Sequence, residues 1–255
     1  MLLSLLLACT ASSAPKTDDT AAVTTTDTDP TPETDFEVPG VEVVSIVTAD
    51  GVTLAADWYA HAPGSPAVLL LHMIPPTYDR SSWPVDFIEL LRTDGYAVLA
   101  LDRRGAGDSG GDAEDAYEGD LGVEDANAAA DFLTGLGFDR LAVIGASNGT
   151  TTTLDYAASA DDTGRPIPWA LSFMSGGTYT VNNTRMGQLD ADALFFIYPD
   201  DEAGWNEEQA ALDPGTWTFQ SYPRGDHGTF MFDAVPTVRD DLRAFLGASL
   251  LAASR

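Results

Sequence analysis

The stretch Leu141-Ala-Val-Ile-Gly-Ala-Ser-Asn-Gly149 decides the fold of this chain. Its apolar first part predicts a buried strand that ends at Gly145, and the residues after Gly149 predict a helix. A serine at a sharp turn between a strand and a helix matches the G-x-S-x-G pattern of a nucleophile elbow. The two glycines remove side chains where strand and helix approach closely, and Ser147 takes a strained backbone geometry. Because a chain with 23 glycines matches this pattern by chance in roughly one case in ten or twenty, the surrounding elements must decide.

Those surrounding elements alternate between strands and helices. Two β-branched runs, residues 41–49 and 52–60, flank Asp50-Gly51 and predict a hairpin. Short continuous apolar runs predict strands buried on both faces, and they cover 67–72, 96–101, 141–144, 169–174, 193–198 and 217–222. One predicted helix begins near Ser81–Pro84 and ends at Gly95. Three more are predicted to cover about 122–136, 150–159 and 237–253. We therefore predict an α/β fold, with a doubly wound, mostly parallel sheet and an N-terminal antiparallel hairpin. The short span from Met174 to Ala193 leaves no room for a sizeable lid domain.

The composition restricts the partners. The chain has 40 acidic and 12 basic residues, a net charge of −28, and Lys16 is its single lysine. Such a surface repels nucleic acid and anionic lipid, so we expect neither as a partner. The single cysteine, Cys9, cannot form a disulfide or a cysteine-based metal site within one chain. We expect no cofactor and no metal.

The first 39 residues differ in composition from the rest. Residues 1–9 are almost wholly apolar and end with Leu6-Leu-Ala-Cys9, which resembles a bacterial lipoprotein signal, although no basic residue precedes the short apolar run. The resemblance implies lipidation of Cys9 and export to the cell envelope, periplasmic or at the cell surface; an ordinary terminus is the alternative. Residues 10–39 are rich in Thr, Asp, Ala and Pro and predict a disordered linker. The folded domain should then span 40–255.

The candidate nucleophile and base come from this arrangement. Functional groups gather at the carboxyl ends of the strands in an open α/β sheet, and Ser147 lies there. A serine hydroxyl is a weak nucleophile that needs a base, held in turn by a third group. His227 lies in a loop with two glycines after the last predicted strand and is our candidate base. We expect His61 to be an exposed turn residue and His72 to bond to backbone at the end of a strand.

The third group should be an acid after the strand that ends at Tyr198. The chain continues there as Pro199-Asp-Asp-Glu202. Counted from the end of the strand, Glu202 best matches the place of the acid in related loops. Asp201 is the second candidate, and Asp200 also remains a candidate. In an acidic protein, at least two of these three carboxylates belong to a solvated loop.

An oxyanion that forms during acyl transfer needs backbone N–H donors directed at it. We expect one donor at Asn148, directly after Ser147 and at the start of a helix. The second should come from the loop that follows strand 67–72, at Met73 or Ile74.

A second glycine motif, Gly105-Ala-Gly-Asp-Ser-Gly110, matches G-x-G-x-x-G, but the carboxylates around it argue against a dinucleotide site.

The order serine, acid, histidine around an elbow resembles the α/β-hydrolase superfamily. The segments Leu71-His-Met-Ile, Asp102-Arg-Arg-Gly-Ala-Gly-Asp-Ser109 and Asp226-His-Gly-Thr look like those of small lidless esterases and dienelactone-hydrolase-like members. The resemblance covers about residues 41–251. It implies hydrolysis of a small-molecule carboxylic ester or thioester through an acyl-serine intermediate. The chain departs from the family at Met73, where a second glycine commonly follows the histidine, and at Pro75-Pro76.

Two further readings stay open at this point. The chain can be a non-catalytic, surface-anchored binding protein that keeps the fold. Within enzymes, peptidases, thioesterases and acyltransferases use the same constellation of side chains. The sequence specifies neither a particular substrate nor an oligomeric state.

Overall fold

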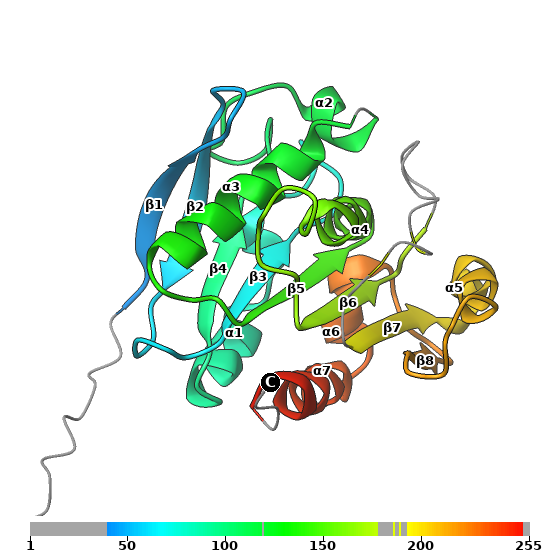
Figure 1. Ribbon diagram of the computed structural model, residues 1–255. Coiled ribbons are helices and arrows are strands. Elements are labelled where there is room, and N and C mark those ends of the chain that lie inside the picture. The colour runs from blue at the N-terminus through cyan, green and yellow to red at the C-terminus, as the bar shows by residue number, and fades with distance from the viewer. Residues whose placement is uncertain (1–39, 119, 178–185, 187–188, 190–192, 252–255) are drawn as a thin grey trace, which may run out of the picture. The chain divides into compact units, whose positions relative to one another are not determined.

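The computed structural model describes residues 40–118, 120–177, 186, 189 and 193–251 (Figure 1). The lipoprotein-like segment 1–9, with Cys9, and the linker 10–39 lie outside the described residues, so those expectations stay predictions. Among the described residues, no helix combines the length and apolar character that crossing a membrane requires.

A mixed sheet forms the centre of the described domain (Figure 1). Its order is β1-β2-β4-β3-β5-β6-β7-β8. The strands are β1 Glu42–Val47, β2 Thr53–Tyr59, β3 Ala67–Leu71, β4 Ala97–Leu101, β5 Leu141–Ala146, β6 Ala170–Met174, β7 Ala193–Pro199 and β8 Thr218–Tyr222. Strand β2 pairs antiparallel with β1 and β4, and all other neighbours are parallel. This confirms the predicted mostly parallel sheet with an N-terminal hairpin.

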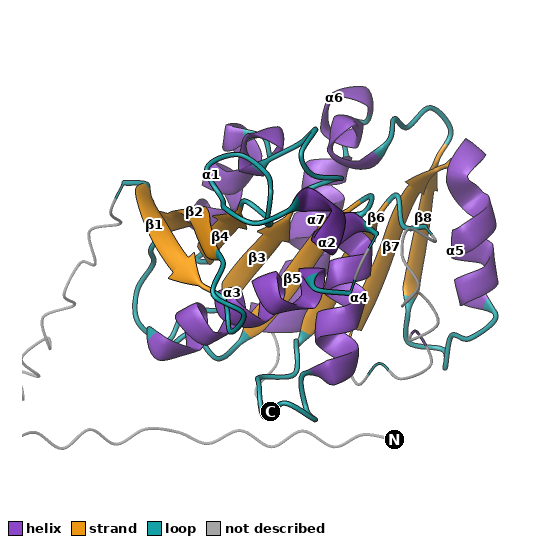
Figure 2. Cartoon of the chain, turned by 90° about the horizontal axis from the view of Figure 1, so that it is seen from above, coloured by secondary structure: helices purple, strands orange, loops and turns teal. Residues whose placement is uncertain are grey.

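Helices cover both faces of this sheet (Figure 2). They are α1 Val85–Thr93, α2 Ala113–Tyr117, α3 Gly122–Gly135, α4 Gly149–Ser159, α5 Ala203–Ala210, α6 Met231–Ala234 and α7 Val238–Leu246. Helices α3 and α4 pack on one face, and α1, α6 and α7 pack on the other. The sequence did not predict α2, α5 and α6. Of these, α2 and α6 are short, and α5 lacks a clear apolar stripe. The predicted helix 237–253 is α7 followed by a π-helical turn to Leu251.

The apolar strands explain why the sheet is buried on both sides. In β3, Leu69 and Leu71 contribute to the core under α3 and α4, whereas Val68 and Leu70 contribute to the core under α1 and α7. All four side chains are fully buried. Alternate residues of a strand point to opposite faces, so a strand covered on both sides reads as a continuous apolar run.

The turn between β5 and α4 depends on its two glycines. A side chain at Gly149 would overlap the carbonyl oxygens of Leu71 and His72 at the end of β3. A side chain at Gly145 would lie 2.6 Å from the carbonyl oxygen of Gly149. The start of α4 therefore contacts the neighbouring strand backbone to backbone. The serine between the glycines has a φ of 50°, which is unusual for a residue other than glycine.

We predict that Gly149→Ala destabilises the protein by about 2 kcal/mol or more, because the obstructing atoms are backbone and cannot rotate away. Gly135→Ala is the matched control, since Gly135 ends α3 with nothing near its missing side chain. There we expect unchanged stability or a gain of up to about 1 kcal/mol, because alanine favours helix over glycine. Urea unfolding of the two variants measures the difference, and equal stabilities would contradict the packing argument.

Candidate active site

Three side chains from three different strand ends meet at one edge of the sheet. Ser147 follows β5, Glu202 ends the single helical turn after β7, and His227 follows β8. The Ser147 hydroxyl lies 2.6 Å from Nε2 of His227, and Nδ1 of His227 lies 2.6 Å from a Glu202 carboxylate oxygen. A carboxylate accepts hydrogen bonds, so Nδ1 carries the proton and Nε2 is free to accept one from the serine. The structure thus joins the three residues in a chain of hydrogen bonds, in which Nε2 of His227 can accept the proton of the Ser147 hydroxyl.

Ser147 is held in place by its own backbone. Its N–H donates to the Met174 carbonyl at 2.8 Å, and its carbonyl accepts from the Thr150 hydroxyl at 2.7 Å. The serine is nearly buried, whereas 39% of the His227 side chain and 30% of the Glu202 side chain are exposed. Small molecules in solvent can therefore reach the imidazole beside a fixed hydroxyl.

The structure distinguishes among the acids that the sequence left open. Burial raises the pKa of Glu202, but hydrogen bonds from His227 and Ser175 outweigh this effect, and the pKa falls below its ordinary value. Glu202 is thus an ionised partner for the imidazole. Asp200 and Asp201 lie in the same turn with exposed side chains, and neither bonds to His227 in the described structure.

Backbone N–H groups beside the serine are free to bind an anion. The N–H groups of Asn148, Met73 and Ile74 donate to no acceptor among the described residues. Met73 is buried beneath the His227 loop, where its sulfur accepts from the Thr229 hydroxyl at 3.8 Å. A side chain at Gly228 would collide with Met73. Methionine at the position where the family commonly has glycine therefore packs against the loop that carries the histidine.

Ser175 is a site residue that the sequence reasoning missed. Its hydroxyl bonds to the Glu202 carboxylate and accepts from the N–H of Gly228 at 2.9 Å. Ser175 is fully buried and has a φ of 52°, and only it and Ser147 show a positive φ among the described residues other than glycine. The available signal was its place directly after the buried strand β6, followed by two glycines. It connects the acid to the loop of the histidine.

The other two histidines lie outside this chain of hydrogen bonds. His72, at the end of β3, is buried and bonds to backbone groups, as predicted; its partners are the Met73 carbonyl and the N–H of Arg103, which follows β4. His61 was predicted to be exposed, but it is half-buried and bonds to Ser65 at 2.8 Å. No group of His, Cys, Asp or Glu side chains in the described part of the chain is arranged to hold a metal ion.

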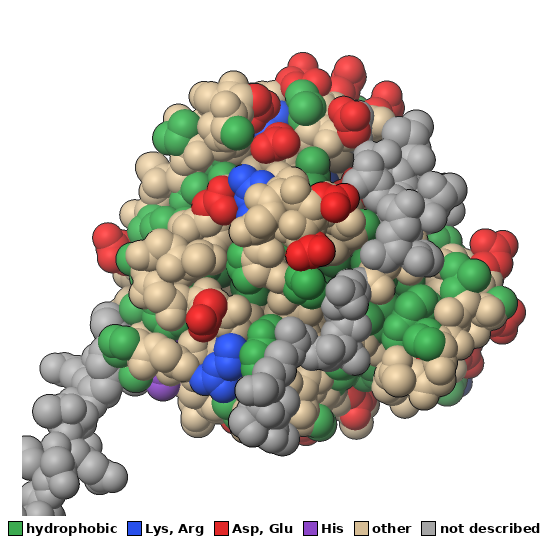
Figure 3. Space-filling model, in the orientation of Figure 1, with side chains coloured by type: hydrophobic (Ala, Val, Ile, Leu, Met, Phe, Trp, Pro, Cys, Tyr) green, Lys and Arg blue, Asp and Glu red, His purple; other side chains and the backbone are tan. Residues whose placement is uncertain are grey.

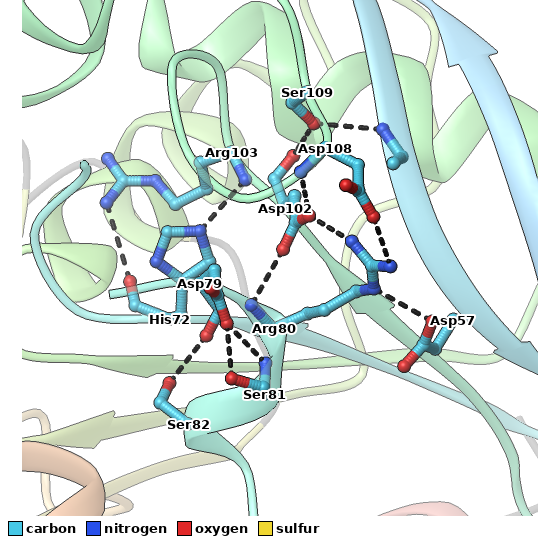
Figure 4. A network of polar contacts seen from close by, with 11 residues as sticks. Asp57, His72, Asp79, Arg80, Ser81, Ser82, Asp102, Arg103, Asp108 and Ser109 are labelled. Atoms are coloured by element: carbon cyan, nitrogen blue, oxygen red, sulfur yellow. Dashed lines mark hydrogen bonds and ion pairs between the residues drawn. The ribbon is translucent and has the colours of Figure 1, made fainter. Parts of the chain in front are cut away.

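The loop Gly105–Gly110, which resembled a dinucleotide motif, binds a carboxylate of the chain itself (Figure 4). The buried Asp102 accepts from the N–H of Asp108 at 2.9 Å and forms an ion pair with Arg80. A side chain at Gly107 would overlap this carboxylate. The Ser109 hydroxyl donates to the Asp102 carbonyl at 2.7 Å and closes the loop. These contacts give the glycines a structural role.

Comparisons with known proteins agree with this architecture. Residues 66–165 match a family model described as the alpha/beta hydrolase fold. An esterase from Pyrococcus furiosus superposes with a TM-score of 0.67 at 18% identity, covering 83% of this chain and 93% of its own. A dienelactone hydrolase from Anabaena variabilis gives 0.67 at 18% identity, covering 84% and 100%. No curated protein matches the sequence significantly.

A third solved structure also superposes on most of this chain. An α/β serine hydrolase without a lid from Xanthomonas campestris superposes with a TM-score of 0.65 at 17% identity, covering 84% of this chain and 97% of its own. At these identities the likeness concerns the fold. The described domain therefore has the α/β-hydrolase fold, with no sizeable lid domain among the described residues, and the predicted resemblance to α/β hydrolases is confirmed.

Proposed function

We propose that this protein is a serine hydrolase that cleaves a carboxylic ester or thioester through an acyl-serine intermediate. The observation that carries the proposal is the pair of 2.6 Å contacts that link Ser147 to His227 and His227 to Glu202. A hydroxyl, an imidazole and an ionised carboxylate in this order are the parts of a catalytic triad. The esterase and the serine hydrolase among the structural relatives support the same reaction class.

The geometry suggests how each group acts. His227 Nε2 accepts the proton of Ser147 as its oxygen attacks the substrate carbonyl, and Glu202 stabilises the imidazolium that forms. The N–H groups of Asn148 and of Met73 or Ile74 bind the oxyanion of the tetrahedral intermediate. His227 then protonates the leaving group. Water, activated by the same imidazole, hydrolyses the acyl-serine and frees Ser147.

A binding protein that keeps the fold without catalysis is the rival hypothesis. Binding alone requires neither a hydroxyl within hydrogen-bond distance of an imidazole nor an acid behind that imidazole. The strained φ of Ser147 also argues for catalysis, because such strain persists where the surrounding structure enforces it and is concentrated at functional sites.

The surroundings of Ser147 suggest an uncharged, apolar ester. The rings of Tyr78 and Phe230 meet edge to face at 5.7 Å, and Phe230 follows His227 by one helical turn. Phe230 is 43% exposed and Ile74 36% exposed, so both offer apolar surface near the reacting groups. Carboxylates are spread over the face of the molecule in Figure 3, with few basic side chains among them. With a net charge of −28, the protein repels anionic substrates.

The proposal predicts that a fluorophosphonate probe labels the protein at Ser147. Labelling of the intact protein should disappear in Ser147→Ala, and hydrolysis of p-nitrophenyl butyrate should disappear with it. Mass spectrometry of the labelled peptide identifies the residue. An unlabelled wild-type protein that is folded, or equal labelling of Ser147→Ala, contradicts the mechanism.

Glu202→Gln should lower kcat by about 10³- to 10⁴-fold, because an amide cannot stabilise the imidazolium or fix the proton on Nδ1. Asp201→Asn is the matched control, with the same loss of one charge in the same turn but an exposed side chain. Its kcat should stay within about twofold of wild type, since it makes no bond to His227. Steady-state kinetics at pH 8 compare the two variants, and the reverse ranking would transfer the role of the acid to Asp201.

The acidic surface predicts a salt dependence that differs between substrates. The singly anionic p-nitrophenyl hemiglutarate should show a kcat/KM about tenfold or more below that of p-nitrophenyl valerate at low salt. The gap should narrow as ionic strength rises from about 0.01 M to about 1 M, because the Debye length falls from about 30 Å to about 3 Å. A gap that does not change with salt would mean that local contacts, and not the net charge, select the substrate.

A further inference from the structure

Arg103 is a fully buried cation that the proposed mechanism does not use. Each hydrogen bond that the structure shows from its side chain goes to a neutral oxygen, and its Nε has no partner among the described residues. Burial lowers the pKa of the guanidinium to about 10, so it stays charged at neutral pH. A buried charge without an ion pair is costly, and it needs a reason.

The neighbouring Arg104 shows what a structural arginine looks like in this loop. Arg104 forms ion pairs with Asp125 and Asp50, both at 2.8 Å, and so its charge is neutralised where it is buried. In the described part of the chain, Arg103 has no such pair, and Asp125 affects it only at longer range. Of these two adjacent arginines, Arg104 is paired with carboxylates and Arg103 is surrounded by neutral oxygens.

The acceptors of Arg103 belong to the segments that carry the proposed oxyanion donors. Its Nη1 donates to Oδ1 of Asn148 at 2.9 Å, and to the carbonyl oxygens of His72 and Met73 at 3.4 Å (Figure 4 shows the contact with His72). Its Nη2 donates to the Thr152 hydroxyl on α4 at 2.8 Å. One guanidinium therefore connects the loop after β3 with the helix that follows Ser147.

Because peptide units are planar, these contacts fix the direction of the N–H groups of Met73 and Ile74. The carbonyl of His72 and the N–H of Met73 belong to one planar trans unit, and the carbonyl of Met73 and the N–H of Ile74 belong to the next. In a trans unit the carbonyl and the N–H point in opposite directions. Holding both carbonyls on Arg103 therefore directs both N–H groups away from it, and these are the groups that lack an acceptor in the described structure.

His72 reinforces the same orientation. The N–H of Arg103 donates to Nε2 of His72 at 2.9 Å, so the proton of the ring lies on Nδ1, which donates to the Met73 carbonyl at 2.8 Å. Burial and the charge of Arg103 lower the pKa of His72 to about 3. The ring thus stays neutral with one tautomer at any pH at which a hydrolase works.

We propose that Arg103 is a positioning residue of the oxyanion hole, a proposal that rests on the proposed hydrolase function. Its guanidinium fixes the two peptide units after β3 and the side chain of Asn148. Its positive charge also polarises those peptide units, so that their N–H groups bind a developing oxyanion more strongly than they bind a neutral carbonyl. The effect belongs to the transition state, not to substrate binding.

The test compares Arg103→Met, which removes the charge at similar length, with Arg103→Lys, which keeps it. We expect Arg103→Met to lower kcat about 10- to 100-fold with KM within about threefold, which is less than the loss of a direct oxyanion donor. A trifluoromethyl ketone inhibitor, which forms an oxyanion on Ser147, should lose affinity by the same factor. The matching methyl ketone, which binds as a neutral carbonyl, should not. Arg103→Lys should recover part of both losses.

Arg140→Met is the matched control, because Arg140 also donates to carbonyl oxygens, those of Leu250 and Gly64, but lies before β5 at the opposite edge of the sheet. The Arg140→Met variant should keep the wild-type kcat and inhibitor affinity, even if the substitution lowers its stability.

A folded Arg103→Met with unchanged kcat, or Lys and Met variants with equal affinity for the trifluoromethyl ketone, overturns the proposal. If Arg103→Met does not fold, wild-type inhibitor affinity in Arg103→Lys overturns it, and weakened affinity at unchanged KM supports it. A wild-type protein without activity or fluorophosphonate labelling contradicts instead the proposed function.

Discussion

The backbone contact between the start of α4 and the end of β3 is the constraint on which the site depends. Gly149 lies against the carbonyl oxygens of Leu71 and His72, and any side chain there would separate the two elements. This contact sets where Ser147 stands relative to the loop after β3. Asn148 and the Met73-Ile74 loop, whose N–H groups donate to no acceptor among the described residues, belong to the two segments that this contact joins. The proposed nucleophile and the proposed oxyanion donors therefore depend on the same backbone contact.

Glu202 and His227 are placed by a second set of contacts, which is centred on Ser175. This serine follows β6, which pairs with β5, the strand that precedes Ser147, and it bonds both to Glu202 and to the loop of His227. Met73 packs against the same loop, at Gly228 and Thr229. Loops are mobile by default, since few of their groups are buried. Here two buried side chains hold a loop whose histidine must stay within hydrogen-bond distance of Ser147.

Much of the fold could be predicted because apolar periodicity and turn glycines are local signals. The hairpin around Asp50-Gly51, the buried strands and the elbow all came from such patterns. The helices α2 and α5 escaped because a short or weakly amphipathic segment carries little periodicity. Within the site, Glu202 could not be separated from Asp201 by sequence alone, since their difference is the direction of a side chain in one helical turn. The roles of Ser175 and Arg103 depend on contacts between segments far apart in the chain, which no local pattern encodes.

The net negative charge of the protein bears on the role of the buried Arg103. A protein with a net charge of −28 opposes the formation of one more negative charge at its surface. Most of that opposition is weakened by water and salt, because exposed carboxylates act through a high dielectric constant. Arg103 is fully buried, so water and salt screen its charge less than they screen the exposed carboxylates. Under the proposed mechanism, Arg103, which forms no ion pair among the described residues and donates to Asn148 and to the loop after β3, opposes the repulsion that an acidic surface exerts on an oxyanion.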